Sequence, residues 1–265
     1  MGVTATGCTN QMNDDFYIGW EDKAPATQAR TMRRVVALIL TATILAAVGL
    51  ATSQRLIGVA YFEWGDVRPF TGVLHAAPYP HLVLRDDLTH APSALMAAPL
   101  VAPLKFGVSP EDIAGFDGRS VTLRATRIYR DGQLMLELEP KSVRLIPGET
   151  AAVPGTARIS LGQQTFRGEI VDSKCWLGVM NPGVLTPHRA CAVRCISGGV
   201  PPMLLVRRQG AAPLNLLLVS PDDKPVNDGV LDLVAEPVEI TGEVVRQGEL
   251  VTLRADPANY RRLSN

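Results

Sequence analysis

The chain has 265 residues with 26 basic and 26 acidic side chains, so its formal net charge is zero. This balance excludes the basic surface on which nucleic-acid binding depends, and we expect no nucleic-acid partner. Hydrophobic residues make up 46% of the sequence but aromatic residues only 5%. Aliphatic side chains must therefore supply the core of one large domain or two small ones.

The first element in chain order is an uncharged apolar segment, residues 35–54. Its length is sufficient to cross the hydrocarbon core of a bilayer as a helix, and it lacks the polar stripe of an amphipathic helix. A cleaved signal peptide is the alternative, although the preceding 34 residues are more than a usual n-region contains. We predict a single transmembrane helix that acts as a signal anchor.

The charges that flank this segment predict its orientation. Arg30, Arg33 and Arg34 precede it, whereas only Arg55 follows closely. The positive-inside rule then places residues 1–34 in the cytoplasm as a tail. The remainder would lie in the periplasm, with the protein held in a bacterial inner membrane.

Beyond the apolar segment, two similar patterns indicate a duplicated β module. Residues 120–140 alternate apolar and polar side chains on both sides of an Asp-Gly turn, and residues 238–257 repeat this hairpin pattern. Upstream of each hairpin lies a related stretch, "FTGVLHAAPYPHLVL" from Phe70 and "FRGEIVDSKCWLGVM" from Phe166. Self-similarity of this kind predicts two copies of one module.

These patterns define the expected architecture as mainly β. A transmembrane helix precedes two small antiparallel modules that are similar to OB-like barrels, the second with a short helix that carries Cys and His. The predicted segments beyond the helix are a first module, a linker, a second module and a C-terminal tail, at residues 60–146, 147–165, 166–257 and 258–265.

The second module holds three of the four cysteines, and its sequence predicts a helix over residues 187–197. Thr186 is a suitable N-cap, and Pro187 suits the first helical position. Gly198 and Gly199 can end the helix in a left-handed conformation.

On that helix His188, Cys191 and Cys195 follow the spacing i, i+3 and i+7, so they share a sector of roughly 60°. Cys175 follows the strand "GEIVD" and can meet this face. Three thiolates and one imidazole form a complete tetrahedral set for Zn²⁺ and are soft enough for Cu(I). Asp172 would support His188 from behind, or simply occupy a turn at the strand end.

Two other interpretations of the cluster stay open. Cysteines outside the cytoplasm are usually oxidised, so Cys175 bonded to Cys191 or Cys195 would attach the helix to the barrel. A third cysteine is then left as a thiol, and a thiol beside a disulfide is also the arrangement of an exchange or sensor site.

The pattern "GEIVDSKC…HRACAVRCISGGVPP" resembles a group of bacterial secreted or membrane-anchored domains of uncharacterised function. Their signature is D-x-x-C, followed by H-x-x-C-A-x-x-C-I-x-x-G-x-P. The resemblance covers about residues 166–255 and implies a small β-barrel-like domain, but it implies no activity. The shared site that it implies consists of Asp172, Cys175, His188, Cys191, Cys195, Gly199 and Pro201.

The sequence contains no Gly-rich phosphate loop, no nucleophile elbow, no H-E-x-x-H and no haem-attachment motif. We therefore expect no nucleotide partner and favour a non-catalytic role. The anchor and the cluster favour an accessory subunit of a membrane-associated redox or respiratory system, with a membrane protein as partner. One alternative is a periplasmic thiol-disulfide or copper-handling protein, and another is an envelope interaction protein with a purely structural disulfide.

Overall fold

A computed structural model of the chain describes residues 24–54, 60–84, 96–148, 158–248 and 250–263. Its contacts divide the chain into two compact units, which meet between residues 58 and 59. Each unit is described by itself.

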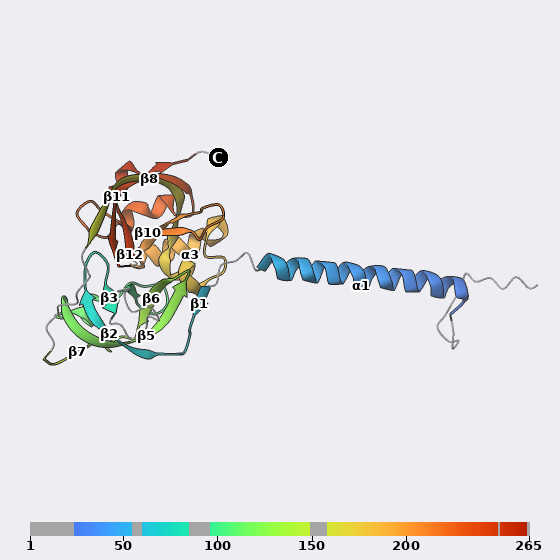
Figure 1. Cartoon of the computed structure of the whole chain (residues 1–265), viewed down its shortest axis with the longest axis horizontal. Helices are drawn as coiled ribbons and strands as arrows, with labels where there is room; N and C mark the ends of the chain where they lie inside the picture. The colour runs from blue at the N-terminus through green and yellow to red at the C-terminus, as the bar shows by residue number, and fades with distance from the viewer. Residues whose placement is uncertain (1–23, 55–59, 85–95, 149–157, 249, 264–265) are drawn as a thin grey trace, which may run out of the picture. The chain divides into compact units, whose positions relative to one another are not determined.

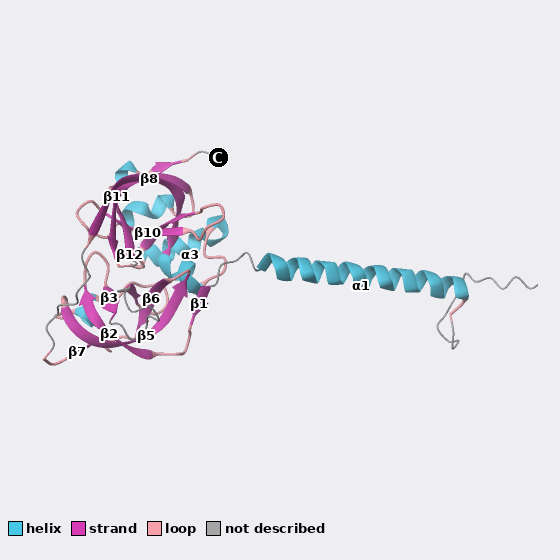
Figure 2. Cartoon of the chain, in the orientation of Figure 1, coloured by secondary structure: helices cyan, strands magenta, loops and turns pink. Residues whose placement is uncertain are grey.

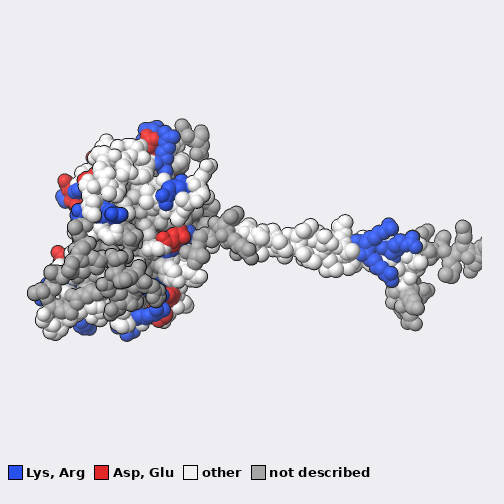
Figure 3. Space-filling model, in the orientation of Figure 1, with Lys and Arg blue, Asp and Glu red and all other residues white. Residues whose placement is uncertain are grey.

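The N-terminal unit contains one long helix, α1 (Ala26–Gln54) (Figure 1). The part from Ala26 to Ser53 has a most apolar window of mean hydropathy 2.4, and it is long enough to cross a membrane. The helix begins nine residues before the predicted start because Arg30, Arg33 and Arg34 are good helix formers and continue it. Figure 3 shows these arginines as a basic cluster at the N-terminal end of an otherwise uncharged rod.

The second unit holds two closed five-stranded barrels and confirms the predicted fold class (Figure 2). The first barrel consists of β2 (Arg68–His75), β3 (His81–Leu84), β4 (Ala97–Val101), β5 (Arg119–Arg130) and β6 (Gln133–Leu138). The second consists of β8 (Ile159–Asp172), β9 (Pro202–Val206), β10 (Leu214–Val219), β11 (Pro237–Gln247) and β12 (Leu250–Arg254).

The two barrels have the same strand connectivity. In each, the first strand pairs with the second and fourth, the second with the third, and the fourth with the fifth, all antiparallel. The third and fifth strands pair in parallel, which closes an OB-like barrel. Shorter elements are β1 (Ala60–Phe62), α2 (Pro110–Ile113), β7 (Arg144–Leu145), η3 (Asp228–Leu233), η4 (Pro257–Asn259) and β13 (Arg261–Arg262).

One pair of glycines shows that the duplication extends to backbone detail. Gly72 in β2 and Gly168 in β8 are the glycines of the two related stretches. A Cβ at Gly72 would overlap the carbonyl oxygen of Val83, and a Cβ at Gly168 would overlap that of Leu205. Both glycines are therefore needed because the second strand of the barrel approaches the first too closely for a side chain.

The predicted Asp-Gly hairpin turn is present between β5 and β6. Asp131 and Gly132 have φ values of 50° and 81°, and Arg130 pairs with Gln133 across them. Positive φ at both central positions is the requirement of a two-residue hairpin loop, and Asp and Gly meet it readily. The second predicted hairpin also forms, because β11 pairs antiparallel with β12 and Gln247 lies opposite Leu250.

Two predicted segment boundaries were wrong. The expected linker, residues 147–165, contains the start of β8, whose exposed residues pair with β11 from Ile159 onward. The expected tail, residues 258–265, adds β13 to β11 and buries Tyr260. The start of β8 and β13 lie at the edge of the sheet and are exposed, so neither segment has the pattern of buried apolar residues that marks a core strand.

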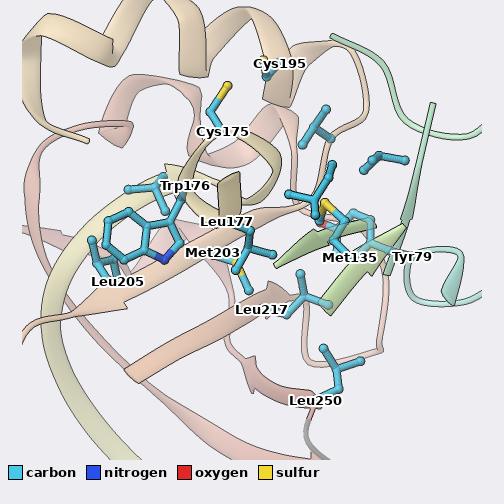
Figure 4. Packing of buried hydrophobic residues seen from close by; sticks show 14 of the residues in the cluster. Tyr79, Met135, Cys175, Trp176, Leu177, Cys195, Met203, Leu205, Leu217 and Leu250 are labelled. Atoms are coloured by element: carbon cyan, nitrogen blue, oxygen red, sulfur yellow. The ribbon is translucent and has the colours of Figure 1, made fainter. Parts of the chain in front are cut away.

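The barrels pack against each other through a shared hydrophobic core. Side chains alternate along the strands, so that Leu204 of β9 faces the interior of the second barrel while Met203 and Leu205 face the other barrel. From the first barrel, Val83 and Met135 join this interface. Figure 4 shows Met135 among the side chains of the second barrel. Strands that are apolar on both faces are the sign of such two-sided burial.

A buried lysine links the two barrels at one end of this interface. Lys174, which follows β8, is only 2% exposed. Its ammonium group lies 2.5 Å from the carboxylate of Glu137 in β6. It also donates hydrogen bonds to the carbonyl oxygens of Ala102 (2.9 Å) and Leu104 (2.8 Å). The ammonium group of Lys174 thus connects the second barrel to β6 and to the loop after β4 of the first barrel.

Replacing Lys174 by methionine is expected to destabilise the second unit strongly. The Glu137 carboxylate, whose side chain is only 14% exposed, would lose its counter-ion, and breaking one partner of a buried pair costs about 3–5 kcal/mol. Denaturant unfolding of the full-length protein in detergent, followed by circular dichroism, measures this loss. The double variant Lys174→Met/Glu137→Leu should recover much of it, and equal stability of the single and double variants would contradict a role for the ion pair.

Candidate metal centre

The predicted cluster lies in an insertion that distinguishes the second barrel from the first. Between β2 and β3 the first barrel has a short loop, residues 76–80, whereas the second inserts η2 (Cys175–Val179) and α3 (Leu185–Ser197) between β8 and β9. In Figure 1, α3 lies between the bodies of the two barrels. The duplication therefore accounts for the scaffold, and the insertion carries the cluster.

Helix α3 is present but begins two residues earlier than predicted, with Val184 at the N-cap. Thr186 and Pro187 thus lie inside the first turn, and the predicted cap at Thr186 was wrong. The reason is that Glu169, a buried carboxylate of β8, accepts a hydrogen bond from the backbone N–H of Leu185. A carboxylate from the sheet thus accepts the hydrogen bond of an N–H group in the first turn, which is the role of a local N-cap side chain.

At the other end, the two glycines have different roles. Gly199 has a φ of 98° and supplies the left-handed conformation that was predicted. Gly198 has a φ of −81°, which any residue can adopt. Its lack of a side chain is required by the first barrel, because a Cβ would overlap the carbonyl oxygen of Lys105.

The structure brings the predicted ligands together in two overlapping sets. Ligand atoms of Cys175, His188 and Cys191 all lie within 4.8 Å of one another, and so do those of Asp172, Cys175 and Cys195. Cys175 belongs to both sets and is the centre of the cluster. A tetrahedral zinc site with Zn–S bonds of about 2.3 Å needs sulfur atoms about 3.8 Å apart, so a shift of about an ångström would close the thiols around an ion.

Asp172 contacts both His188 and the turn that follows β8, the two positions considered for it from the sequence. One oxygen accepts a hydrogen bond from the backbone N–H of Cys175 (2.7 Å), and the other lies 2.9 Å from Nε2 of His188. When Nε2 donates to this carboxylate, the lone pair of the neutral ring lies on Nδ1. This carboxylate–histidine pair is the arrangement that fixes the tautomer of a metal-bound imidazole.

The thiols differ in burial and in protonation. Cys175 and Cys195 are buried, whereas Cys191 is partly exposed, and none of the three forms a disulfide. A hydrogen bond with Cys195, together with burial, raises the pKa of Cys175. The same hydrogen bond from Cys175 lowers the pKa of Cys195, and the nearby charge of Lys105 acts in the same direction. Without an ion, Cys195 is therefore the preferred thiolate of this pair.

Lys105 of the first barrel completes the cluster, and the sequence did not reveal it. Its ammonium nitrogen lies 2.6 Å from Sγ of Cys191 and 3.9 Å from Sγ of Cys195. The hydrogen bond to Cys191, followed by the charges of the thiols, raises the pKa of Lys105. The lysine is separated from Cys191 by 86 positions in the sequence, so no local spacing could have predicted their contact.

Close backbone contact holds this lysine in place. The N–H of Gly107 donates a 2.9 Å hydrogen bond to the carbonyl oxygen of Gly198. A Cβ at Gly107 would overlap the carbonyl oxygen of Gly199, and Phe106 lies beneath the guanidinium group of Arg194. The cluster thus belongs to both barrels, because the first barrel contributes its cation and the second its thiols.

Chemically, the cluster offers soft ligands, an imidazole and a neighbouring cation. Thiolates and imidazole suit Zn²⁺ and Cu(I). The same proximity also permits exchange chemistry, because Cys175 lies close to both other thiols.

Comparisons of the chain with protein-family models, with curated proteins and with solved structures find no match.

We expect Gly198→Ala to separate the Lys105 loop from α3. The backbone at this position accommodates alanine, so the cost comes from overpacking against Lys105 and amounts to about 1–3 kcal/mol. Trypsin cleavage after Lys105 in the folded full-length protein should become faster. Ser197→Ala, at an exposed neighbouring position, serves as the matched control and should be cleaved at the wild-type rate, and the same rate for Gly198→Ala would contradict the close contact.

Proposed function

We propose that this protein is a membrane-anchored, extracytoplasmic metal-binding protein that holds one Zn²⁺ ion through Cys175, His188, Cys191 and Cys195. The observation that carries the proposal is the convergence of three thiols and a carboxylate-paired imidazole on the centre formed by Cys175. Such a set satisfies the ligand number and type of a closed zinc site.

Charge balance supports Zn²⁺ over Cu(I). Three thiolates and Zn²⁺ leave one negative charge, which the ammonium group of Lys105 offsets at Cys191. The buried carboxylate of Asp172 then remains as the negative partner of His188. With Cu(I) in place of Zn²⁺ the same groups would carry a further negative charge, and an uncompensated charge in a buried site is costly.

The burial of the ligands supports a site with one exchangeable position. Cys175, His188 and Cys195 are buried, and only Cys191 is partly exposed. An incoming thiol ligand can therefore replace Cys191 first, once Lys105 has moved from its sulfur. Such a site suits the transfer of an ion to or from a partner as well as its retention.

The cellular role that we propose is that of an accessory subunit in a membrane-associated redox or respiratory system. Helix α1 has the length and hydropathy to serve as its anchor, and the arginines at its N-terminal end favour a cytoplasmic N-terminus. The second unit would then lie in the periplasm beside a membrane protein partner. The aromatic residues Phe16, Tyr17 and Trp20, which fall outside the described residues, are candidates for that contact.

A thiol-disulfide function is the second candidate, and the contact between Lys105 and Cys191 favours it. A lysine beside a partly exposed thiol is a setting in which cysteines react as nucleophiles. If Cys191 attacks the disulfide of a partner, it forms a mixed disulfide and releases one partner thiol. Cys175, which lies in the same set of contacts, would then attack Cys191 Sγ, releasing the second partner thiol and leaving a Cys175–Cys191 disulfide. Copper handling would use the same residues with Cu(I) as cargo.

Metal content and thiol state together test these functions. In the full-length Cys8→Ser variant, which leaves only the three clustered cysteines, we expect one zinc ion per chain. The three thiols should be protected from a thiol reagent until a chelator removes the ion. A metal-free protein whose non-reduced peptide map shows Cys175 bonded to Cys191 or Cys195 would overturn the zinc proposal, and reversible reduction of that bond would favour the second candidate.

Asp172→Asn should weaken zinc binding while the barrel stays folded. Asparagine keeps the size of the side chain but removes the charge that orients His188, and loss of such a supporting group typically costs about 10–100-fold in metal affinity. Competition with a chelating dye measures the affinity, and circular dichroism reports the fold. Asp228→Asn, an exposed acid in the same barrel, is the matched control, and equal affinities of the two variants would contradict the role assigned to Asp172.

A further inference from the structure

A second polar site lies in a cleft of about 230 Å³ that is lined by residues from both barrels. His75 and His81 come from the first barrel, while Arg158, Gln247 and Thr252 come from the second. None of these residues belongs to the cysteine cluster. No aspartate or glutamate lines the cleft among the described residues, so hard cations have no ligands there.

Among the described residues that line this cleft, His81 has one buried ring nitrogen without a hydrogen-bond partner. The side chain is 3% exposed, and its Nδ1 lies 2.9 Å from the carbonyl oxygen of Tyr79. A carbonyl only accepts, so Nδ1 carries the proton and Nε2 has the lone pair. Nε2 is buried and has no hydrogen-bond partner among the described residues. Burial lowers the pKa of His81 to about 4, which keeps the ring neutral near pH 7.

The two imidazoles are poorly arranged to share a metal ion. The rings of His75 and His81 are stacked, with centroids 5.1 Å apart and planes inclined by 23°. Lone pairs of an imidazole lie in the ring plane, so nearly parallel rings direct them side by side rather than toward one point. The stacking instead holds the ring of His81 in place and leaves Nε2 as a buried acceptor without a donor. Such an acceptor is costly, so a ligand that donates a hydrogen bond to it would be favoured.

Arg158 supplies the positive side of the cleft. Its two terminal nitrogens donate to the carboxylate of Asp223 at 2.9 and 2.8 Å, which holds the guanidinium group in one orientation. Asp223 is also paired with Arg254 at 3.1 Å, so one carboxylate serves two cations. The charge of Arg158 contributes to the lowered pKa of His81, in accord with its position near the ring.

We propose that this cleft binds a small oxyanion that still carries a proton, with hydrogenphosphate as the simplest case. The hydroxyl of the anion would donate to Nε2 of His81, and its charged oxygens would face Arg158 and the amide of Gln247. An anion without a proton would place an oxygen lone pair against the lone pair of Nε2. The cleft should therefore bind an anion that carries a proton more tightly than an anion of the same shape that carries none.

Hydrogenphosphate and sulfate provide the test, because both are tetrahedral but only phosphate carries a proton near pH 7. In calorimetry with the full-length protein in detergent, hydrogenphosphate is expected to bind about 10–100-fold more tightly than sulfate, because sulfate leaves the buried acceptor Nε2 without a donor. In the same sample, the ¹⁵N resonance of His81 Nε2 should shift on addition of phosphate. Equal binding of the two anions, or no shift of that resonance, would overturn the proposal.

Two variants separate the parts of the site. His81→Phe retains the stacking with His75 but removes the acceptor, so it should abolish the preference for phosphate over sulfate. Arg158→Gln, at a side chain that is 41% exposed and tolerates replacement, should weaken both anions together. Unchanged selectivity in a folded His81→Phe protein would contradict the role of Nε2. These outcomes do not depend on the zinc content of the cysteine cluster.

Discussion

The ammonium group of Lys174 fixes the relation between the two barrels on which the cysteine cluster depends. It is buried beside Cys175, and its acceptors all come from the first barrel: Glu137 and the carbonyl oxygens of Ala102 and Leu104. A buried charge is tolerated only with full hydrogen bonding, so these acceptors must stay where they are. Lys105 follows Leu104 directly in the chain, so the hydrogen bond from Lys174 to Leu104 acts together with the Gly107–Gly198 contact to place Lys105 beside Cys191.

The duplicated barrel has allowed the two copies to specialise. The strand order and the close glycine contact are the same in both, but only the second has an insertion long enough for η2 and α3. The first barrel contributes a cation to the cysteine cluster and imidazoles to the cleft at His81. Each site thus draws on both copies, and an isolated copy would contain only half of either one.

Sequence patterns predicted those features that depend on local chemistry. The Asp131-Gly132 turn, the alternation in β5 and β6, and the helical spacing of His188, Cys191 and Cys195 all follow from the period of one element. The matched stretches around Gly72 and Gly168 revealed the duplication because both barrels have the same steric constraint. These features are enough to predict the fold class and most of the Cys/His cluster.

Features that depend on contact between distant segments could not be predicted in this way. Lys105 and Lys174 are ordinary lysines in the sequence, and their importance comes only from the packing of one barrel on the other. The cap of α3 was misassigned for the same reason, since Glu169 satisfies it from a strand. Gly198 was predicted to take a left-handed conformation, which only Gly199 has, and the structure shows instead that the carbonyl oxygen of Lys105 leaves no room for a side chain at Gly198.

The order of the parts along the chain has a consequence for biosynthesis. Chains are made from the N-terminus, and domains tend to fold in that order. The strands of the first barrel and the Lys105 loop are therefore complete before Cys175, Cys191 and Cys195 have been added. The three thiols emerge after the surface that covers them has been made, which shortens the time during which they can form wrong disulfides.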